Sequence, residues 1–154
     1  MDFASYITGF TDGEGCFLIS FNQRAKLKTG LEVQPSFSIS QHKRNRKILE
    51  DIHSYFKCGG IHFSKRDQNY KWEVRSLSDI LTKIIPHFEK YQLKTKKKDD
   101  FLIFREICFL MKESKHLNAK YLSEIIDKAY IMNESGKRKY TKSKLLRILN
   151  KKMR

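Results

Sequence analysis

The sequence is short of cysteine, proline and glycine, and each shortage excludes a kind of protein. Its 154 residues include three cysteines, two prolines and seven glycines. The cysteines at 16, 58 and 108 are odd in number and widely spaced, without a CxxC pair, which argues against a disulfide framework and a zinc site. The sequence has no internal repeat and no linker rich in proline, glycine or serine, so we expect one domain over residues 1–154.

Long hydrophobic runs are also missing. No apolar stretch approaches the roughly 20 residues that cross a bilayer, which excludes a membrane-spanning protein. The opening MDFASYITGF has neither a basic start nor an unbroken apolar core, so no secretory signal is visible. Together with the cysteine pattern, this predicts an intracellular, reducing compartment. The 11 phenylalanines and seven tyrosines still supply enough apolar area for a core, so disorder is not expected.

Acidic residues are scarce relative to basic ones. The chain has 17 Asp and Glu against 32 Lys and Arg, a formal charge of +15. Such a surplus repels itself in the folded protein, and a polyanionic partner is the usual reason for it. The basic residues recur in separate segments instead of on one face of an amphipathic helix, which favours double-stranded DNA over an anionic membrane. These segments are 43–47, 94–98, 137–144 and 151–154. A lysine-rich surface that serves only solubility is the alternative.

The pattern of apolar residues predicts an α+β fold. Strands are expected at 16–24, 31–41, 61–66 and 70–75, and helices at 2–11, 46–56, 77–85, 86–91, 96–111, 118–132 and 142–150. This order, α-β-β-α-β-β-α followed by further helices, suits a four-stranded antiparallel sheet backed by helices. In the second strand pair the residues expected to face the core are Ile61, Phe63, Tyr70, Trp72 and Val74.

The opposite face of this sheet is polar and basic, with Leu18 as its one hydrocarbon. Such side chains hydrogen-bond to base edges, and a two-stranded ribbon fits the major groove. The nucleic-acid-binding residues expected on the strands are Leu18, Ser20, Asn22, Arg24, Glu32, Gln34, Ser36, Ser38, His62, Ser64, Arg66, Lys71, Glu73 and Arg75. Phosphate contacts are expected from Lys137, Arg138 and Lys139. An ordinary solvated sheet face and a solvated basic turn are the alternatives.

The first helix carries Ser5, Gly9 and Gly13 four residues apart, a stripe small enough to admit another backbone. Two glycines weaken a helix, so we expect close packing against a second helix to compensate. If that helix belongs to a second copy, Asp12 and Glu14 of both copies meet near a two-fold axis. Crowded carboxylates need cations, their oxygens suit Mg²⁺, and paired ions can cleave a phosphodiester. Taken alone, Asp-Gly and Glu-Gly are also ordinary turn sequences.

Residues 6–17, YITGFTDGEGCF, resemble the LAGLIDADG motif that names a family of homing endonucleases. A second stretch, 86–101, resembles the family's other recurrent segment in its PHF, Tyr91, LKTKK and DF. The order of the elements and the basic turn at 133–141 match too, so the resemblance covers nearly the whole chain. It implies cleavage of both strands of a long, near-palindromic DNA site with Mg²⁺ or another divalent cation such as Mn²⁺. One motif copy implies a homodimer through the first helix, with Ser5, Gly9, Asp12 and Gly13 at the interface.

The resemblance also implies roles for single residues. Glu14 falls on the second acidic position, which binds the metal, and the carbonyl of Gly13 can join it. Asp12 falls on the first acidic position, whose role lies more in the helix junction. Gln41 matches a position that holds solvent near the metal, and Lys94 matches a lysine that points into the active site and can stabilise charge on phosphate. An exposed strand-end amide and a solvated lysine are the alternatives for these two.

Asn45 departs from the family pattern, because related proteins often carry a basic residue there; Arg44 or Arg46 is the candidate to replace it.

Two other functions also fit the sequence. An RNA maturase would bind intron RNA, but a pure binder has no reason to keep Glu14 facing phosphate, since the carboxylate repels the ligand. A basic component of a ribonucleoprotein would bind in a way that depends on salt and hardly on sequence.

Overall fold

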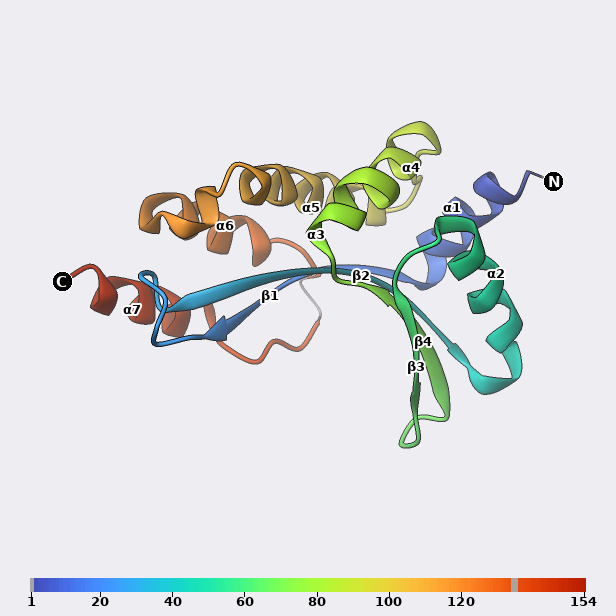
Figure 1. The fold of residues 1–154 in the computed structure, drawn as a ribbon, viewed down its shortest axis with the longest axis horizontal. Helices are drawn as coiled ribbons and strands as arrows, with labels where there is room; N and C mark the ends of the chain where they lie inside the picture. The colour runs from blue at the N-terminus through green and yellow to red at the C-terminus, as the bar shows by residue number, and fades with distance from the viewer. Residues whose placement is uncertain (1, 134–135) are drawn as a thin grey trace. The chain divides into compact units, whose positions relative to one another are not determined.

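The expected order of elements is confirmed in the computed structural model, which describes residues 2–133 and 136–154 (Figure 1). The chain begins with α1 (Phe3–Glu14), β1 (Gly15–Gln23), β2 (Leu31–His42), α2 (Arg46–Phe56), β3 (Gly60–Ser64) and β4 (Asn69–Val74). It continues with α3 (Leu77–Asp79), a π-helical turn (Ile80–Ile84), α4 (Ile85–Lys90), α5 (Lys97–Lys112), α6 (Ala119–Ala129) and α7 (Lys142–Lys152). Short 3-10 helices precede α2 (Lys43–Asn45) and α6 (Lys115–Leu117).

The four strands form one antiparallel sheet in the order β1-β2-β4-β3, which confirms the expected fold class. Strands β1 and β3 therefore lie at its edges. The register between β2 and β4 places Phe37 opposite Val74 and Ile39 opposite Trp72. These inward side chains of the central strands are fully buried: Phe37, Ile39, Trp72 and Val74 are all 0% exposed.

Burial alternates along β1 as the sequence pattern predicts, but β2 is buried continuously from Pro35 to Ile39, and the pattern fails near the tip of the second hairpin. Phe17, Ile19 and Phe21 of β1 are buried as expected. In the second hairpin Phe63, expected in the core, is 43% exposed, so that prediction is wrong. Its ring contacts Tyr70 with centroids 4.8 Å apart. The reason is position: β3 is an edge strand, and the hairpin turn extends beyond α2 (Figure 1).

Contacts group the chain into two compact units. The first contains residues up to Phe17 and Ser36–Lys98, and its centre is a set of rings in which Phe37 lies 4.7 Å from Phe17 and 5.4 Å from Phe88 between centroids. The second contains Leu18–Pro35 and Asp99–Arg154, in which α6 packs with α7. The single-domain organisation expected from the sequence stays a prediction. In residues 2–133 and 136–154, none of the helices is both long and apolar enough to cross a membrane.

The junction between α1 and β1 has no loop. Asp2 caps α1 by accepting hydrogen bonds from the amides of Ala4 and Ser5. The helix continues past the expected end at Thr11 to Glu14, because the amide of Gly15 donates to the carbonyl of Thr11 and completes another turn. Only glycine fits at 15: a Cβ there would lie 2.5 Å from the Thr11 methyl group and 2.9 Å from its carbonyl oxygen. The two carboxylates of the motif therefore lie on the last helical turn.

A buried histidine joins three elements of the first unit. His87, on α4, is 6% exposed. Its Nε2 lies 3.1 Å from the Thr8 hydroxyl of α1, and its Nδ1 lies 3.2 Å from the Tyr55 hydroxyl of α2. Burial lowers the pKa of His87 to about 4, while the charge of Asp2 acts in the opposite direction. The histidine is therefore neutral at pH 7 and links the elements through hydrogen bonds.

This histidine predicts a loss of stability on mild acidification. An unfolded histidine titrates near pH 6.5, so between about pH 6.5 and 4 the unfolded chain binds the proton that buried His87 refuses. Stability is full above pH 6.5 and falls by at most about 3 kcal/mol as the pH drops toward 4. Thermal melting of the wild type and of His87→Asn between pH 7.5 and 4.5 measures this; the variant should lose the part of the pH dependence that His87 contributes. His62→Asn, at an exposed position, is the control, and equal slopes in wild type and His87→Asn would contradict the prediction.

Candidate active site and nucleic-acid interface

The two carboxylates at the end of α1 have different surroundings. Glu14 is exposed, whereas Asp12 is half-buried. The carboxylate of Asp12 accepts hydrogen bonds from the amides of Lys94 (3.0 Å) and Thr95 (3.1 Å) and from the Thr95 hydroxyl (2.8 Å). Burial acts to raise the pKa of Asp12, but the hydrogen bonds from Thr95 and Lys94 outweigh it and hold that pKa below its usual value. Asp12 therefore fastens the segment before α5 to α1, as expected for a helix junction, and Glu14 stays available.

The segment fastened by Asp12 brings lysines next to α1. Lys94 is exposed and lines a groove of about 520 Å³ along the helix. The groove is also lined by Ser5, Thr8, Gly9, Asp12, Lys90, Tyr91 and Gln92. Lys97 was missed by the sequence analysis: its Nζ donates to the carbonyl of Gly15, the residue after Glu14. A run of lysines from 94 to 98 does not reveal which of them folds back, so the sequence offered no signal for this contact.

The end of β2 carries a small polar network. The Oε1 of Gln41 accepts a hydrogen bond from the Nδ2 of Asn45 at 3.2 Å. Arg46 stacks its guanidinium 4.7 Å from the centroid of the Tyr70 ring and pairs with Glu50 at 2.8 Å. Arg46 is therefore held by the protein, and Arg44, which is exposed, is the better candidate to supply the basic residue absent at Asn45.

The oxygens near Glu14 fit a hard divalent cation, although one chain provides only part of a coordination shell. Among residues 2–133 and 136–154 no group of three or more His, Cys, Asp or Glu side chains could hold a metal ion. The Glu14 carboxylate and the Gly13 carbonyl are ligands that Mg²⁺ and Mn²⁺ accept, whereas the Asp12 oxygens are already used. The remaining ligands would have to come from water, from substrate phosphate and from a second copy.

On the outer face of α1 no other described part of the chain covers the backbone at the two glycines. A Cβ built at Gly9 or at Gly13 would meet nothing within 4 Å. Beside these glycines Phe3, Tyr6 and Phe10 stack in a row, with centroids 5.9 and 5.8 Å apart. Phe3 and Tyr6 are each 36% exposed. Small residues flanked by partly exposed rings are suited to close contact with another helix.

The outward positions of the sheet are only partly open. His62, Arg66, Lys71, Arg75 and Arg24 are exposed, and the half-buried positions are Leu18, Ser20, Asn22, Glu32, Gln34, Ser64 and Glu73. Ser36 and Ser38, expected on the open face, are only 6% and 7% exposed. These serines lie on a central strand, where short side chains are covered by longer neighbours. A direct DNA contact by Ser36 or Ser38 is therefore not supported, while the other contacts stay predictions.

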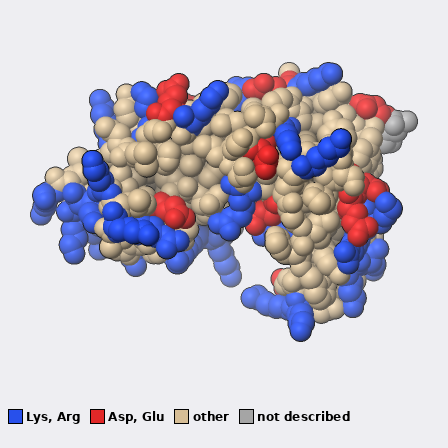
Figure 2. Space-filling model, in the orientation of Figure 1, with Lys and Arg blue, Asp and Glu red and all other residues tan. Residues whose placement is uncertain are grey.

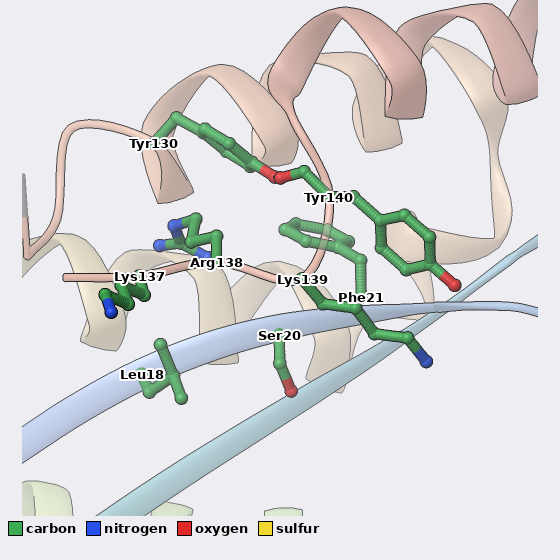
Figure 3. Close-up of a pocket in the computed structure, with 8 residues that line it drawn as sticks. All are labelled: Leu18, Ser20, Phe21, Tyr130, Lys137, Arg138, Lys139 and Tyr140. Atoms are coloured by element: carbon green, nitrogen blue, oxygen red, sulfur yellow. The ribbon is translucent and has the colours of Figure 1, made fainter.

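In the basic segment between α6 and α7, one of the three residues expected to contact phosphate is bound to the protein's own backbone instead. Lys137 and Lys139 are exposed, but the guanidinium of Arg138 donates to the carbonyl of Ile19 at 2.7 Å and to that of Ala129 at 2.6 Å. The phosphate contact expected of Arg138 is therefore not supported. A pocket of about 120 Å³ separates this segment from the outward side chains of β1 (Figure 3). Its lining residues are Leu18, Ser20, Phe21, Tyr130, Lys137, Arg138, Lys139 and Tyr140.

A further basic surface lies on α7. Lys144, Arg147 and Lys151 are exposed at helical spacing and, with Gln23 and Ile148, line a groove of about 460 Å³. Figure 2 shows Lys and Arg side chains gathered over α7 and at the tip of the β3–β4 hairpin. The spacing i, i+3, i+7 is visible in the sequence and could have indicated this stripe.

The family follows from comparison with known proteins. The model of the LAGLIDADG endonuclease family matches residues 7–108, which include most of α1, the sheet and most of α5. The chain belongs to the LAGLIDADG endonuclease family, which confirms the resemblance stated from the motif.

Similar proteins include both longer chains and chains of the same length. A probable intron-encoded endonuclease 2 from Neurospora crassa is 37% identical over 130 residues, covering 84% of this chain and 29% of that protein. Among solved structures, the homing endonuclease I-TnaI is 36% identical with a TM-score of 0.84, and coverage is 97% of both chains. The archaeal intron-encoded homing endonuclease I-Vdi141I, complexed with DNA, is 31% identical with a TM-score of 0.88, covering 97% of this chain and 96% of that one. The chain thus spans under a third of the Neurospora protein.

Proposed function

We propose that the protein is a homodimeric homing endonuclease that makes a double-strand break in a long, pseudo-palindromic DNA site, with Mg²⁺ or another divalent cation such as Mn²⁺. The observation that carries the proposal is an exposed Glu14 at the end of a helix whose glycine face is open. The net charge of +15 supports a DNA partner, and the relative I-Vdi141I is complexed with DNA.

The active site is assembled from residues on three segments. Glu14 and the Gly13 carbonyl would hold the cation, which when bound would make water more acidic and stabilise charge on the phosphate. Gln41 orients the attacking water. Lys94 stabilises the negative charge that develops on the phosphate, and Asp12 holds the backbone of Lys94 beside α1. The two copies in the dimer act on one DNA strand each.

The sheet sets the length of DNA that is read. Strand β1 has 9 residues and β2 has 12. At about 3.3 Å per residue each strand spans roughly 30 to 40 Å, which is about 9 to 12 base steps. Two copies therefore cover on the order of 18 base pairs or more. Many modest contacts along such a site add up to specificity, at about 1 to 3 kcal/mol for each well-read base pair.

The alternatives explain Glu14 less well. An RNA maturase acting on intron RNA, or a basic component of a ribonucleoprotein, uses positive charge but gains nothing from an exposed carboxylate beside the basic segment 94–98. An intracellular location stays a prediction for all three functions.

The test is digestion of a randomised duplex library with the full chain, with and without Mg²⁺ or Mn²⁺, followed by sequencing of the cleaved ends. We expect cleavage only with the cation, and a cleaved population that shares one site with two related halves. Retention of intron-like RNA without cleavage of any duplex would favour the maturase. Cleavage unaffected by chelation, or no cleavage with either cation, would overturn the proposal.

A further inference from the structure

Arg138 joins two backbone carbonyls, one at the end of α6 and one on the edge strand β1. Ala129 ends α6, where the last carbonyls lack intrahelical donors, and its carbonyl accepts from the Met132 amide at 3.2 Å as well as from Arg138. Ile19 lies on β1, an edge strand of the sheet, where carbonyls that face outward have no neighbouring strand. The two guanidinium nitrogens reach these oxygens at 2.6 and 2.7 Å. One side chain therefore binds the segment before α7 both to the end of α6 and to the edge of β1.

Aromatic side chains complete the attachment. The guanidinium of Arg138 lies 4.5 Å from the centroid of the Tyr130 ring, and the Tyr130 hydroxyl donates to the carbonyl of Tyr140. Burial raises the pKa of Tyr130, so this hydroxyl keeps its proton. The planar, multiply donating guanidinium suits this arrangement, and a lysine ammonium cannot bond two separated carbonyls and stack in the same way.

The attachment leaves two lysines outside. Lys137 and Lys139 are exposed on either side of half-buried Arg138, and in Figure 3 the segment runs alongside β1 while the Lys139 side chain extends away from the Arg138 guanidinium. The ammonium of Lys139 also lies 5.2 Å from the centroid of the Tyr140 ring. Both lysines line the same pocket as Leu18 and Ser20.

We propose that Arg138 is a positioning residue for DNA binding: it holds segment 137–139 along the free edge of β1, so that Lys137 and Lys139 contact two phosphates of the duplex. This inference rests on the proposed function, since it needs a DNA partner. In this proposal Arg138 itself does not contact DNA. It therefore differs from the expectation that residues 137, 138 and 139 all bind phosphate.

Salt dependence of binding tests the proposal. The full chain is titrated with a mixed-sequence duplex in EDTA, and the slope of log K against log salt is measured between about 50 and 200 mM, where each phosphate contact adds about 0.9 to the slope. Lys137→Ala and Lys139→Ala should each reduce the slope by about 0.9, which is about 3.5-fold in K over this range. Arg138→Lys keeps the charge but releases both lysines, so it should reduce the slope by about 1.8, or about 12-fold. Adding Lys137→Ala to Arg138→Lys should then reduce the slope no further.

The controls separate positioning from folding and from direct contact. Arg105→Lys, the same change at a half-buried arginine of α5 outside the expected DNA-binding residues, should leave the slope unaltered. If Arg138 only stabilises the fold, Arg138→Lys lowers K equally at every salt concentration, and an unchanged slope of this kind overturns the proposal. If adding Lys137→Ala to Arg138→Lys reduces the salt slope by as much as Lys137→Ala alone does, the proposal is also overturned. Tyr130→Phe removes the bond to Tyr140 but keeps the ring, and should reduce the slope less than Arg138→Lys; this variant serves if Arg138→Lys does not fold. A wild type that fails to bind duplex overturns the proposed function itself.

Discussion

Replacement of Glu14 by glutamine is expected to reduce double-strand cleavage by at least about 100-fold while leaving DNA binding intact. Glutamine keeps the size of the side chain but removes the negative charge that a divalent cation needs, and the loss of one such interaction costs several kcal/mol of transition-state stabilisation. Because Glu14 is exposed and ends α1, the exchange does not disturb packing. The measurement is cleavage of a selected target with Mg²⁺, together with binding of the same duplex in EDTA.

Glu113→Gln is the matched control, because it makes the same change in charge at another exposed position. It should cleave as fast as the wild type. Full cleavage by Glu14→Gln would remove the metal role from this residue. Loss of binding by Glu14→Gln together with loss of cleavage would instead point to a structural role at the junction.

Replacement of Gly9 by leucine should separate the two copies of the dimer. In the single chain a Cβ at position 9 meets nothing within 4 Å, so the variant should fold and melt like the wild type or slightly higher, since leucine is a better helix former. Against a partner helix in close contact, overpacking costs about 2 to 3 kcal/mol, which weakens association roughly 100-fold. Sedimentation equilibrium should then report a species near the 18.3 kDa of one chain, and double-strand cleavage should be lost.

The control for Gly9→Leu is Ser143→Leu, which places the same side chain on an exposed position of α7. Ser143→Leu should have the same mass in sedimentation equilibrium as the wild type. A dimer that persists in Gly9→Leu would show that this face of α1 is not the contact between copies. A wild type that is monomeric even on its target duplex would remove the homodimer from the proposal altogether.

The two motif carboxylates have different roles, so neither can replace the other. Asp12 accepts hydrogen bonds from two amides and a hydroxyl, and these fix the segment that carries Lys94. A carboxylate used in this way has few lone pairs left for a cation. Glu14, one half-turn later, points its charge into solvent and is available to a ligand.

Much of the fold was predictable because it follows from local periodicity. Helix α2 begins and ends at the expected residues, since Asn45 and the Cys58-Gly59-Gly60 stop bound a clear apolar stripe. The strands agree to within about two residues. Phe63 was placed wrongly because alternation tells which residues share a face, and does not tell how far the covering helices extend along that face.

The site was predictable where it lies within one motif and unpredictable where distant segments meet. Glu14 and the glycine stripe are neighbours in sequence, so the motif places them together. The folding back of Lys97 onto Gly15 spans 82 residues, and the inward turn of Arg138 spans 119 residues to Ile19. Local spacing carries no information about such contacts, and a basic side chain in a basic run gives no sign that it is paired.

The sequence by itself determined the order of elements, the excess of positive charge and the motif that identifies the family, because these depend on residue type and short spacing. Only the tertiary structure decided which members of each basic run face solvent, which of the two acids is used in the fold, and that Ser36 and Ser38 are covered. The physical reason is that a side chain's exposure and partners depend on segments far along the chain, which are brought beside it by packing of the core.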